Sequence, residues 1–180
     1  MTQHEYVFVA ISIVLGLAIT RLLHTVGMLI RAHRFVTFHW ATTAWGLCVM
    51  SYSLQMWWVG WGLSSKEVWT FGDYAVLTAG AIFVYGAAEM ALPAADGQQD
   101  LDFLRHSQGL GRLSALSMLL YFAIGPYVNI VMFGNDMLAS LFFPVIGMIL
   151  TALMIALPRI FPLMAVLFTI YTIVIITLTV

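Results

Sequence analysis

The stretch LGLAITRLLHTVGMLIRAHR, residues 15–34, decides the fold class of this chain. It reads as the second half of an apolar helix that ends in basic residues, yet Arg21 and His24 lie well inside it. The whole chain is 62% hydrophobic and 8% charged, whereas soluble domains carry roughly 25% charged residues. We therefore expect lipid to surround most of the chain, and an arginine and a histidine within a span need an explanation.

A helix of about 20 mostly apolar residues can cross a bilayer. We predict an all-α, polytopic membrane protein in which residues 1–180 form one domain, a single bundle of six transmembrane helices. The predicted helices cover residues 6–30, 39–63, 69–92, 112–134, 137–157 and 160–180. Residues 93–111 form the one long connection, expected as a short helix or loop on the cytoplasmic surface. The first helix is expected to be an uncleaved anchor, because basic residues follow it rather than precede it.

The basic residues indicate the orientation. Six arginines fall on or near one side of the predicted bundle and the single lysine, Lys66, falls on the other. The arginines in the loops are Arg31, Arg34, Arg105, Arg112 and Arg159. The positive-inside rule then predicts cytoplasmic loops after the odd-numbered helices and both termini outside. The tryptophans around residues 64–67 suit an aromatic belt at the outer interface.

Glu89 is the only acidic residue deep within a predicted span. Arg21 lies ten residues before Arg31, or about 15 Å along a helix, more than its own side chain spans. An arginine within a span costs on the order of 2.5–3.5 kcal/mol. We expect Arg21 to meet Glu89 with His24 alongside. Three interpretations stay open: a structural ion pair, a proton- or ion-coupled site, or an arginine that snorkels to the interface.

Small and polar residues recur every fourth position along the first predicted helix. They are Ser12, Gly16, Thr20 and His24. Small residues allow the close approach on which helix packing in lipid relies. The pattern predicts that this stripe is the buried face, so that Gly16→Leu should disturb the bundle more than Ala18→Leu.

A second polar layer is predicted nearer the outside. Gln55 and Asn129 lie in the outer parts of the second and fourth predicted helices, and Pro126 and Pro144 should kink the fourth and fifth. Two kinks at similar depth could frame a cavity, as broken helices do in transporters, or could be ordinary bends. Asp73, near the outer end of the third predicted helix, is expected to be solvated.

No enzyme signature is present, since the chain lacks a zinc-binding His-Glu-x-x-His helix and a Gly-x-Ser-x-Gly elbow. We expect no enzymatic activity, metal or cofactor. The net charge of -1 gives no footprint for nucleic acid. The expected partners are the lipid bilayer and either further copies of the chain or other membrane subunits. The predicted function is a transporter or channel-like unit. The alternative is a non-catalytic helper or scaffold subunit of a larger membrane complex.

Two stretches carry a resemblance. ISIVLGLAITRLLHTVGMLIR, residues 11–31, and SLQMWWVGW, residues 53–61, resemble a group of small bacterial multi-pass inner-membrane proteins of uncharacterised function. The likeness covers mainly the first three predicted helices. It implies the bacterial plasma membrane as the location and implies no activity and no site residues.

Overall fold

The computed structural model describes residues 2–95 and 100–179 and is 84% helical. The long helices are α1 (Gln3–Arg31), α2 (Trp40–Gly62), α3 (Phe71–Met90), α5 (Arg112–Tyr127), α6 (Met137–Ala156) and α7 (Phe161–Thr179). The short elements are η1 (His33–Phe35), β1 (Val36–Thr37), η2 (Leu63–Ser65), β2 (Leu101–Asp102), α4 (Phe103–Gln108), the π-helix η3 (Val128–Met132) and η4 (Pro158–Ile160). The all-α fold class is confirmed.

Each predicted helix coincides with a long helix to within a few residues at either end, except that the predicted helix 112–134 comprises α5 and the π-helix η3 that follows it. Among the described residues, five helical segments are long and apolar enough to cross a membrane: Gln3–Arg31, Phe71–Met90, Arg112–Met132, Met137–Ala156 and Pro158–Thr179. Helix α2 is not among them, because its tryptophans, glycines and hydroxyl side chains lower its mean hydropathy. The sequence therefore predicts the six long helices correctly. Five of them are also long and apolar enough to cross a membrane, and α2 is the exception.

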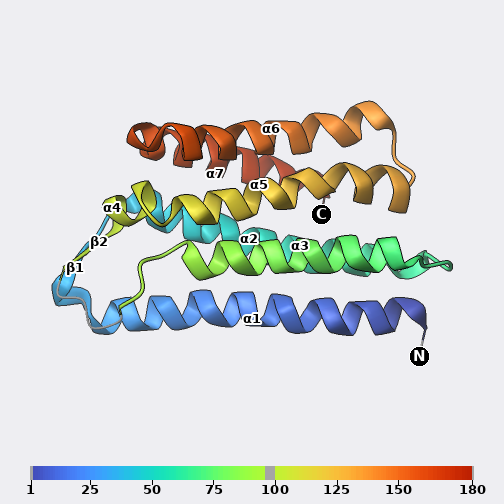
Figure 1. The fold of residues 1–180 in the computed structure, drawn as a ribbon, viewed down its shortest axis with the longest axis horizontal. Coiled ribbons are helices and arrows are strands. Elements are labelled where there is room, and N and C mark those ends of the chain that lie inside the picture. The colour runs from blue at the N-terminus through green and yellow to red at the C-terminus, as the bar shows by residue number, and fades with distance from the viewer. Residues whose placement is uncertain (1, 96–99, 180) are drawn as a thin grey trace.

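The long helices form two layers (Figure 1). Helices α1, α3, α5 and α6 lie side by side in that order, and α2 and α7 lie behind them. Helix α2 packs on α1, α3 and α7, and α7 also contacts α6. A short parallel ladder pairs Val36 of β1 with Leu101 of β2. The connections that follow α1 and α3 therefore meet at one end of the bundle, opposite the N-terminus (Figure 1).

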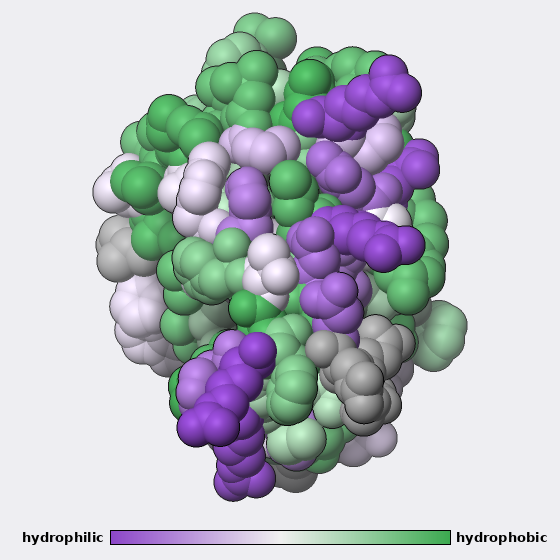
Figure 2. Space-filling model, turned by 90° about the vertical axis from the view of Figure 1, so that its left-hand side faces the viewer, coloured by the Kyte–Doolittle hydropathy of each residue, from purple (hydrophilic) through white to green (hydrophobic). Residues whose placement is uncertain are grey.

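Hydrophilic side chains gather on that end of the molecule (Figure 2). It is called the basic end here, because it carries Arg31, Arg34, Arg105, Arg112 and Arg159. The opposite end, with the start of α1 and the connection between η3 and α6, is called the far end. The separation of arginines by end follows the pattern predicted from the sequence.

The connection after α3 is docked on the bundle rather than lying loosely over it. Phe103 of α4 is 5% exposed, and its carbonyl accepts a hydrogen bond of 2.9 Å from Thr42 Oγ1. His106 Nε2 donates to the carbonyl of Met90 at 3.1 Å, and burial lowers the pKa of His106. The predicted short helix is α4. Residues 96–99 of the predicted loop lie outside the described residues.

The buried face of α1 differs from the predicted stripe. The buried residues of α1 are Val7, Ile11, Leu15, Ala18, Leu22, Thr25 and Leu29, a repeat of three and four residues. Thr20 and His24 are exposed, and a Cβ on Gly16 would meet nothing within 4 Å. The prediction that Ser12, Gly16, Thr20 and His24 form the buried face is therefore wrong. Large apolar side chains, rather than small ones, make the contact of α1 with its neighbours.

Close helix approach occurs elsewhere in the bundle. A Cβ on Gly80 of α3 would lie 2.6 Å from Ile124 Cδ1 of α5. A Cβ on Gly147 of α6 would lie 2.8 Å from the ring of Phe122. Small residues therefore allow close packing of α5 on α3 and α6, whereas Gly16 of the predicted stripe on α1 does not lie at such a contact.

These contacts reverse the expected order of two substitutions in α1. Ala18→Leu adds three carbons at a position with 0% exposure, and overpacking of this kind costs about 1–3 kcal/mol. Gly16→Leu adds a side chain where there is open space, and it replaces a poor helix former. In denaturant unfolding of the purified protein in detergent, Ala18→Leu should be clearly destabilised and Gly16→Leu should lie within about 1 kcal/mol of wild type. A larger loss for Gly16→Leu would contradict this packing of α1.

Candidate functional site

Two polar arrangements predicted from the sequence can be located in the bundle. The first joins α1 and α3, where Arg21 Nη2 lies 2.8 Å from Glu89 Oε1. Their side chains are 32% and 37% exposed, so the ion pair lies at the perimeter of the bundle. His24 is exposed and makes no polar contact with another described residue. The structure brings Arg21 and Glu89 together and leaves His24 outside the pair.

The second arrangement surrounds a cavity of about 420 Å³ near the far end, called the outer cavity here. Residues from α2, α3, α5, η3, α6 and α7 line it. Gln55, Asn129 and Pro144 are among them, so three residues of the predicted outer layer meet in one place. Gln55 Nε2 also donates a hydrogen bond of 3.2 Å to Thr179 Oγ1. Neither Arg21 nor Glu89 lines this cavity.

Irregular backbone surrounds the outer cavity. Pro144 lies inside α6 and Pro126 inside α5. Since proline has no N–H, it cannot bond the carbonyl four residues earlier, and those residues, Ser140 and Phe122, both line the cavity. Helix α5 then continues into the π-helix η3, a rare element found frequently at functional sites. The two prolines thus lie in the helices that surround the cavity.

Pro144 of α6 also lies against α5. A Cβ on Gly125 would lie 3.1 Å from Pro144 Cγ, so α5 and α6 pack closely where both are interrupted. Pro126 itself does not line the outer cavity. Its contribution is to the path of the backbone that carries Asn129 to the cavity wall.

Two buried hydroxyl groups of the cavity wall form no hydrogen bond of regular geometry with a described residue. They are Tyr52 Oη, in a residue 1% exposed whose hydroxyl lies near those of Tyr171 and Thr172, and Ser140 Oγ, in a residue 3% exposed. By contrast, Tyr171 Oη donates to the carbonyl of Phe143 at 2.8 Å. A buried polar group left unpaired costs roughly 1–3 kcal/mol, so such groups normally have a partner. Both residues line the cavity, but neither hydroxyl oxygen is itself exposed to it in this conformation.

Aromatic rings close the inner end of the outer cavity. The ring of Tyr52 stands edge-on to that of Phe122, with their centroids 5.2 Å apart. Phe168 packs beneath, 5.9 Å from Tyr52 and 5.8 Å from Tyr171 between centroids. Edge-to-face and tilted ring packing of this kind is favourable. None of the described residues that line the cavity belongs to the basic end.

The outer cavity has an uncharged interior. Among residues 2–95 and 100–179, those that line it include no lysine, arginine or histidine, and the one acidic residue is Asp136. That residue is exposed, and its Oδ2 accepts a hydrogen bond of 3.1 Å from Leu138 N. Within residues 2–95 and 100–179 there is no group of three or more His, Cys, Asp or Glu side chains placed to hold a metal ion. An ionic ligand would find no buried counter-charge inside the cavity.

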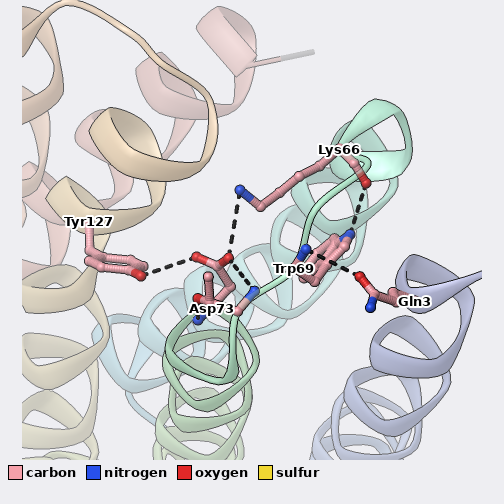
Figure 3. Close-up of polar contacts among 6 residues, drawn as sticks. Gln3, Lys66, Trp69, Asp73 and Tyr127 are labelled. Atoms are coloured by element: carbon pink, nitrogen blue, oxygen red, sulfur yellow. Dashed lines mark hydrogen bonds and ion pairs between the residues drawn. The ribbon is translucent and has the colours of Figure 1, made fainter.

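Asp73 supports the π-helix and was misjudged from the sequence. It is 1% exposed rather than solvated. Its Oδ1 accepts a hydrogen bond of 3.1 Å from Tyr127 Oη, and its Oδ2 lies 3.6 Å from Lys66 Nζ (Figure 3). Asp73 also forms a capping box with Thr70 at the start of α3, a spacing that the sequence TFGD already contains. Because Tyr127 directly precedes η3, these bonds fix the segment that carries Asn129.

The Arg21–Glu89 pair predicts an asymmetric double-mutant cycle. Glu89→Gln should destabilise the protein more than Arg21→Gln, because an unpaired arginine stays charged while an unpaired carboxyl group can take up a proton. The double mutant should recover part of the loss, with a coupling free energy above about 0.5 kcal/mol. The measurement is denaturant unfolding of all members in one detergent. Strictly additive losses would show that the two groups do not interact, and His24→Ala, which removes an exposed side chain without contacts, serves as the control.

Comparison with known proteins does not supply a function for this arrangement. No protein-family model, no curated protein and no solved structure matches the chain. A fold alone would in any case not determine an activity, because function depends on the chemistry of a site. The outer cavity is therefore the basis for the function proposed below.

Proposed function

We propose that the chain is a multi-pass protein of the bacterial inner membrane and that all six long helices, α2 included, span the bilayer. Helix α2 has 23 residues, a length of about 35 Å. The chain enters α2 from β1 at the basic end and passes from α2 to α3 at the far end. Helix α3 then leads back to the basic end, where β2 pairs with β1. If α1 and α3 both cross the membrane, α2 must cross between them.

The surface of the bundle supports this proposal. Large apolar side chains are exposed along α1, α2, α5, α6 and α7, with Ile13, Leu47 and Ile149 each more than half exposed. Apolar exposure of this extent around a bundle is typical of helices that face lipid. The arginines at the basic end support a cytoplasmic location for that end, with both termini outside, by the positive-inside rule. The resemblance to small bacterial inner-membrane proteins agrees with this location.

Within that membrane, the proposed function is uptake of a small, uncharged and largely apolar molecule into the outer cavity, as the first step of a transporter or channel-like activity. The observation that carries the proposal is the outer cavity itself, whose mainly apolar wall also carries the partly exposed amides of Gln55 and Asn129. Its volume lies in the range of small-molecule sites. Broken helices that line a binding site are also a property of transporters.

The helper-subunit alternative receives no specific support. A helper should have a dry bundle and one conspicuous apolar interface. Here a cavity lies at the Gln55–Asn129 layer, and the exposed apolar side chains are spread over most helices rather than concentrated on α7. The ion pair of Arg21 with Glu89 fits best as a structural link between α1 and α3, because it lies at the perimeter.

The proposal can be tested with three probes of nearly the same shape and different charge. They are 2-phenylethanol, phenethylammonium and phenylacetate, added at equal concentration to the purified protein in detergent. We expect 2-phenylethanol to raise the unfolding temperature most and phenylacetate least, because the cavity interior offers hydroxyl and amide groups and no cation. Ala139→Phe should abolish the stabilisation by filling the cavity wall.

Ala152→Phe is the matched control, since it makes the same substitution at another exposed position of α6 that does not line the cavity. It should keep the response of the wild type. Equal responses to all three probes, or an unchanged response in Ala139→Phe, would contradict uptake of an uncharged molecule by the outer cavity.

A further inference from the structure

A second hollow, of about 490 Å³, lies between α1 and α2 in the half of the bundle nearest the basic end. It is called the inner groove here. Its walls include Leu22, Val26 and Ile30 of α1 and Leu47 and Met50 of α2. Val26, Ile30 and Leu47 are exposed, so the groove opens sideways from the bundle. Almost all of its lining is aliphatic or aromatic carbon.

The inner groove has the depth of one membrane leaflet. From Leu22 to Ile30 the helix rises about 12 Å, and half of a hydrocarbon core of about 30 Å is roughly 15 Å. Below this apolar stretch the lining ends at His33 of η1. The groove therefore runs from the cytoplasmic interface toward the bilayer centre in the proposed orientation, parallel to the acyl chains of the inner leaflet.

Two arginines lie beside the cytoplasmic end of the inner groove, next in the chain to lining residues although they do not line it themselves. Arg31 and Arg34 flank His33, are exposed, and form no ion pair with a described residue. The acidic residue that strand pairing brings near, Asp102 opposite Thr37, caps α4 by accepting a hydrogen bond of 3.0 Å from Arg105 N. The two guanidinium groups are thus available to an anion, and arginine suits phosphate oxygens through paired hydrogen bonds.

We propose that the inner groove binds one acyl chain of an anionic phospholipid of the inner leaflet, with the phosphate headgroup at Arg31 and Arg34. The apolar length of the inner groove suits the acyl chain, and the unpaired arginines suit the negative charge of the headgroup. Basic pockets between transmembrane helices on the cytoplasmic side bind anionic headgroups by the same combination. The proposal rests on the membrane location proposed above and not on the use of the outer cavity.

Native mass spectrometry of the full chain from a neutral detergent tests the proposal. Dioleoylphosphatidylglycerol and dioleoylphosphatidylcholine are added in equal amounts, and the singly bound complexes are counted. The wild type should prefer phosphatidylglycerol, with each arginine contributing about five-fold. The double variant Arg31→Gln, Arg34→Gln should lose that preference. The double variant Arg112→Gln, Arg159→Gln, which removes the same two charges from the same end at residues that do not line the groove, should keep it.

A second pair of variants tests the acyl chain separately from the headgroup. Val26→Trp should reduce binding of both lipids by narrowing the inner groove, while Ile13→Trp, at an exposed position of α1 that does not line it, should not. No preference in the wild type, or full binding in Val26→Trp, would overturn the proposal. A dimer of the wild type that dissociates in Val26→Trp would show instead that a second copy fills the groove. A failure of the phenylethanol series would leave this result unaffected.

Discussion

A helix in hydrocarbon must satisfy its own backbone hydrogen bonds, because no water is present to do so. In the proposed membrane location, Pro126 and Pro144 break that condition in two adjacent helices, each at a residue where the helices pack closely on one another. Backbone groups released in this way are tolerated where they are buried in protein or line a cavity. The outer cavity is the space in which this requirement is met, and the π-helix η3 carries the irregular segment past it.

Two charged groups of the bundle lie at different places relative to these prolines. Asp73 holds Tyr127, and with it the start of η3, at the far end. The Arg21–Glu89 pair joins α1 to α3 away from the cavity. One polar group therefore supports the irregular backbone, and the other joins regular helices. Asp73 and the Arg21–Glu89 pair therefore have different structural roles, although in the sequence both are charged residues within apolar helices.

The sequence predicts the helices well because apolar runs and the polar turns between them are local properties of the chain. It also predicts that Gln55, Asn129 and Pro144 share one layer, since depth follows from position along each helix. It does not predict the buried face of α1. Gly16 and Ala18 are both small, and only the position of α3 decides which of them is covered. Rotation of a helix about its axis is a tertiary property when apolar residues occupy every side.

The same distinction explains the remaining differences. Asp73 is buried by Tyr127, which lies 54 residues away in the chain, although its capping box with Thr70 is local and could have been recognised. The lack of a regular hydrogen bond at Tyr52 Oη and Ser140 Oγ depends on several helices at once, and no sequence pattern marks it. The features most informative about function are thus those that depend on contacts between distant segments.

The central claim is that the outer cavity is open to the outside of the membrane while the basic end is cytoplasmic. Thiol labelling tests it in intact expressing cells, after removal of the native thiol by Cys48→Ala, with a maleimide carried on a polar, uncharged and membrane-impermeant chain. Asn129→Cys in the partly exposed cavity wall and Asn135→Cys in the exposed turn should both be labelled, whereas Asp100→Cys should react only after the membrane is permeabilised. Adding Ala139→Phe should protect Asn129→Cys and leave Asn135→Cys reactive. Labelling of Asp100→Cys in intact cells, with Asn129→Cys and Asn135→Cys unreactive, would contradict the account.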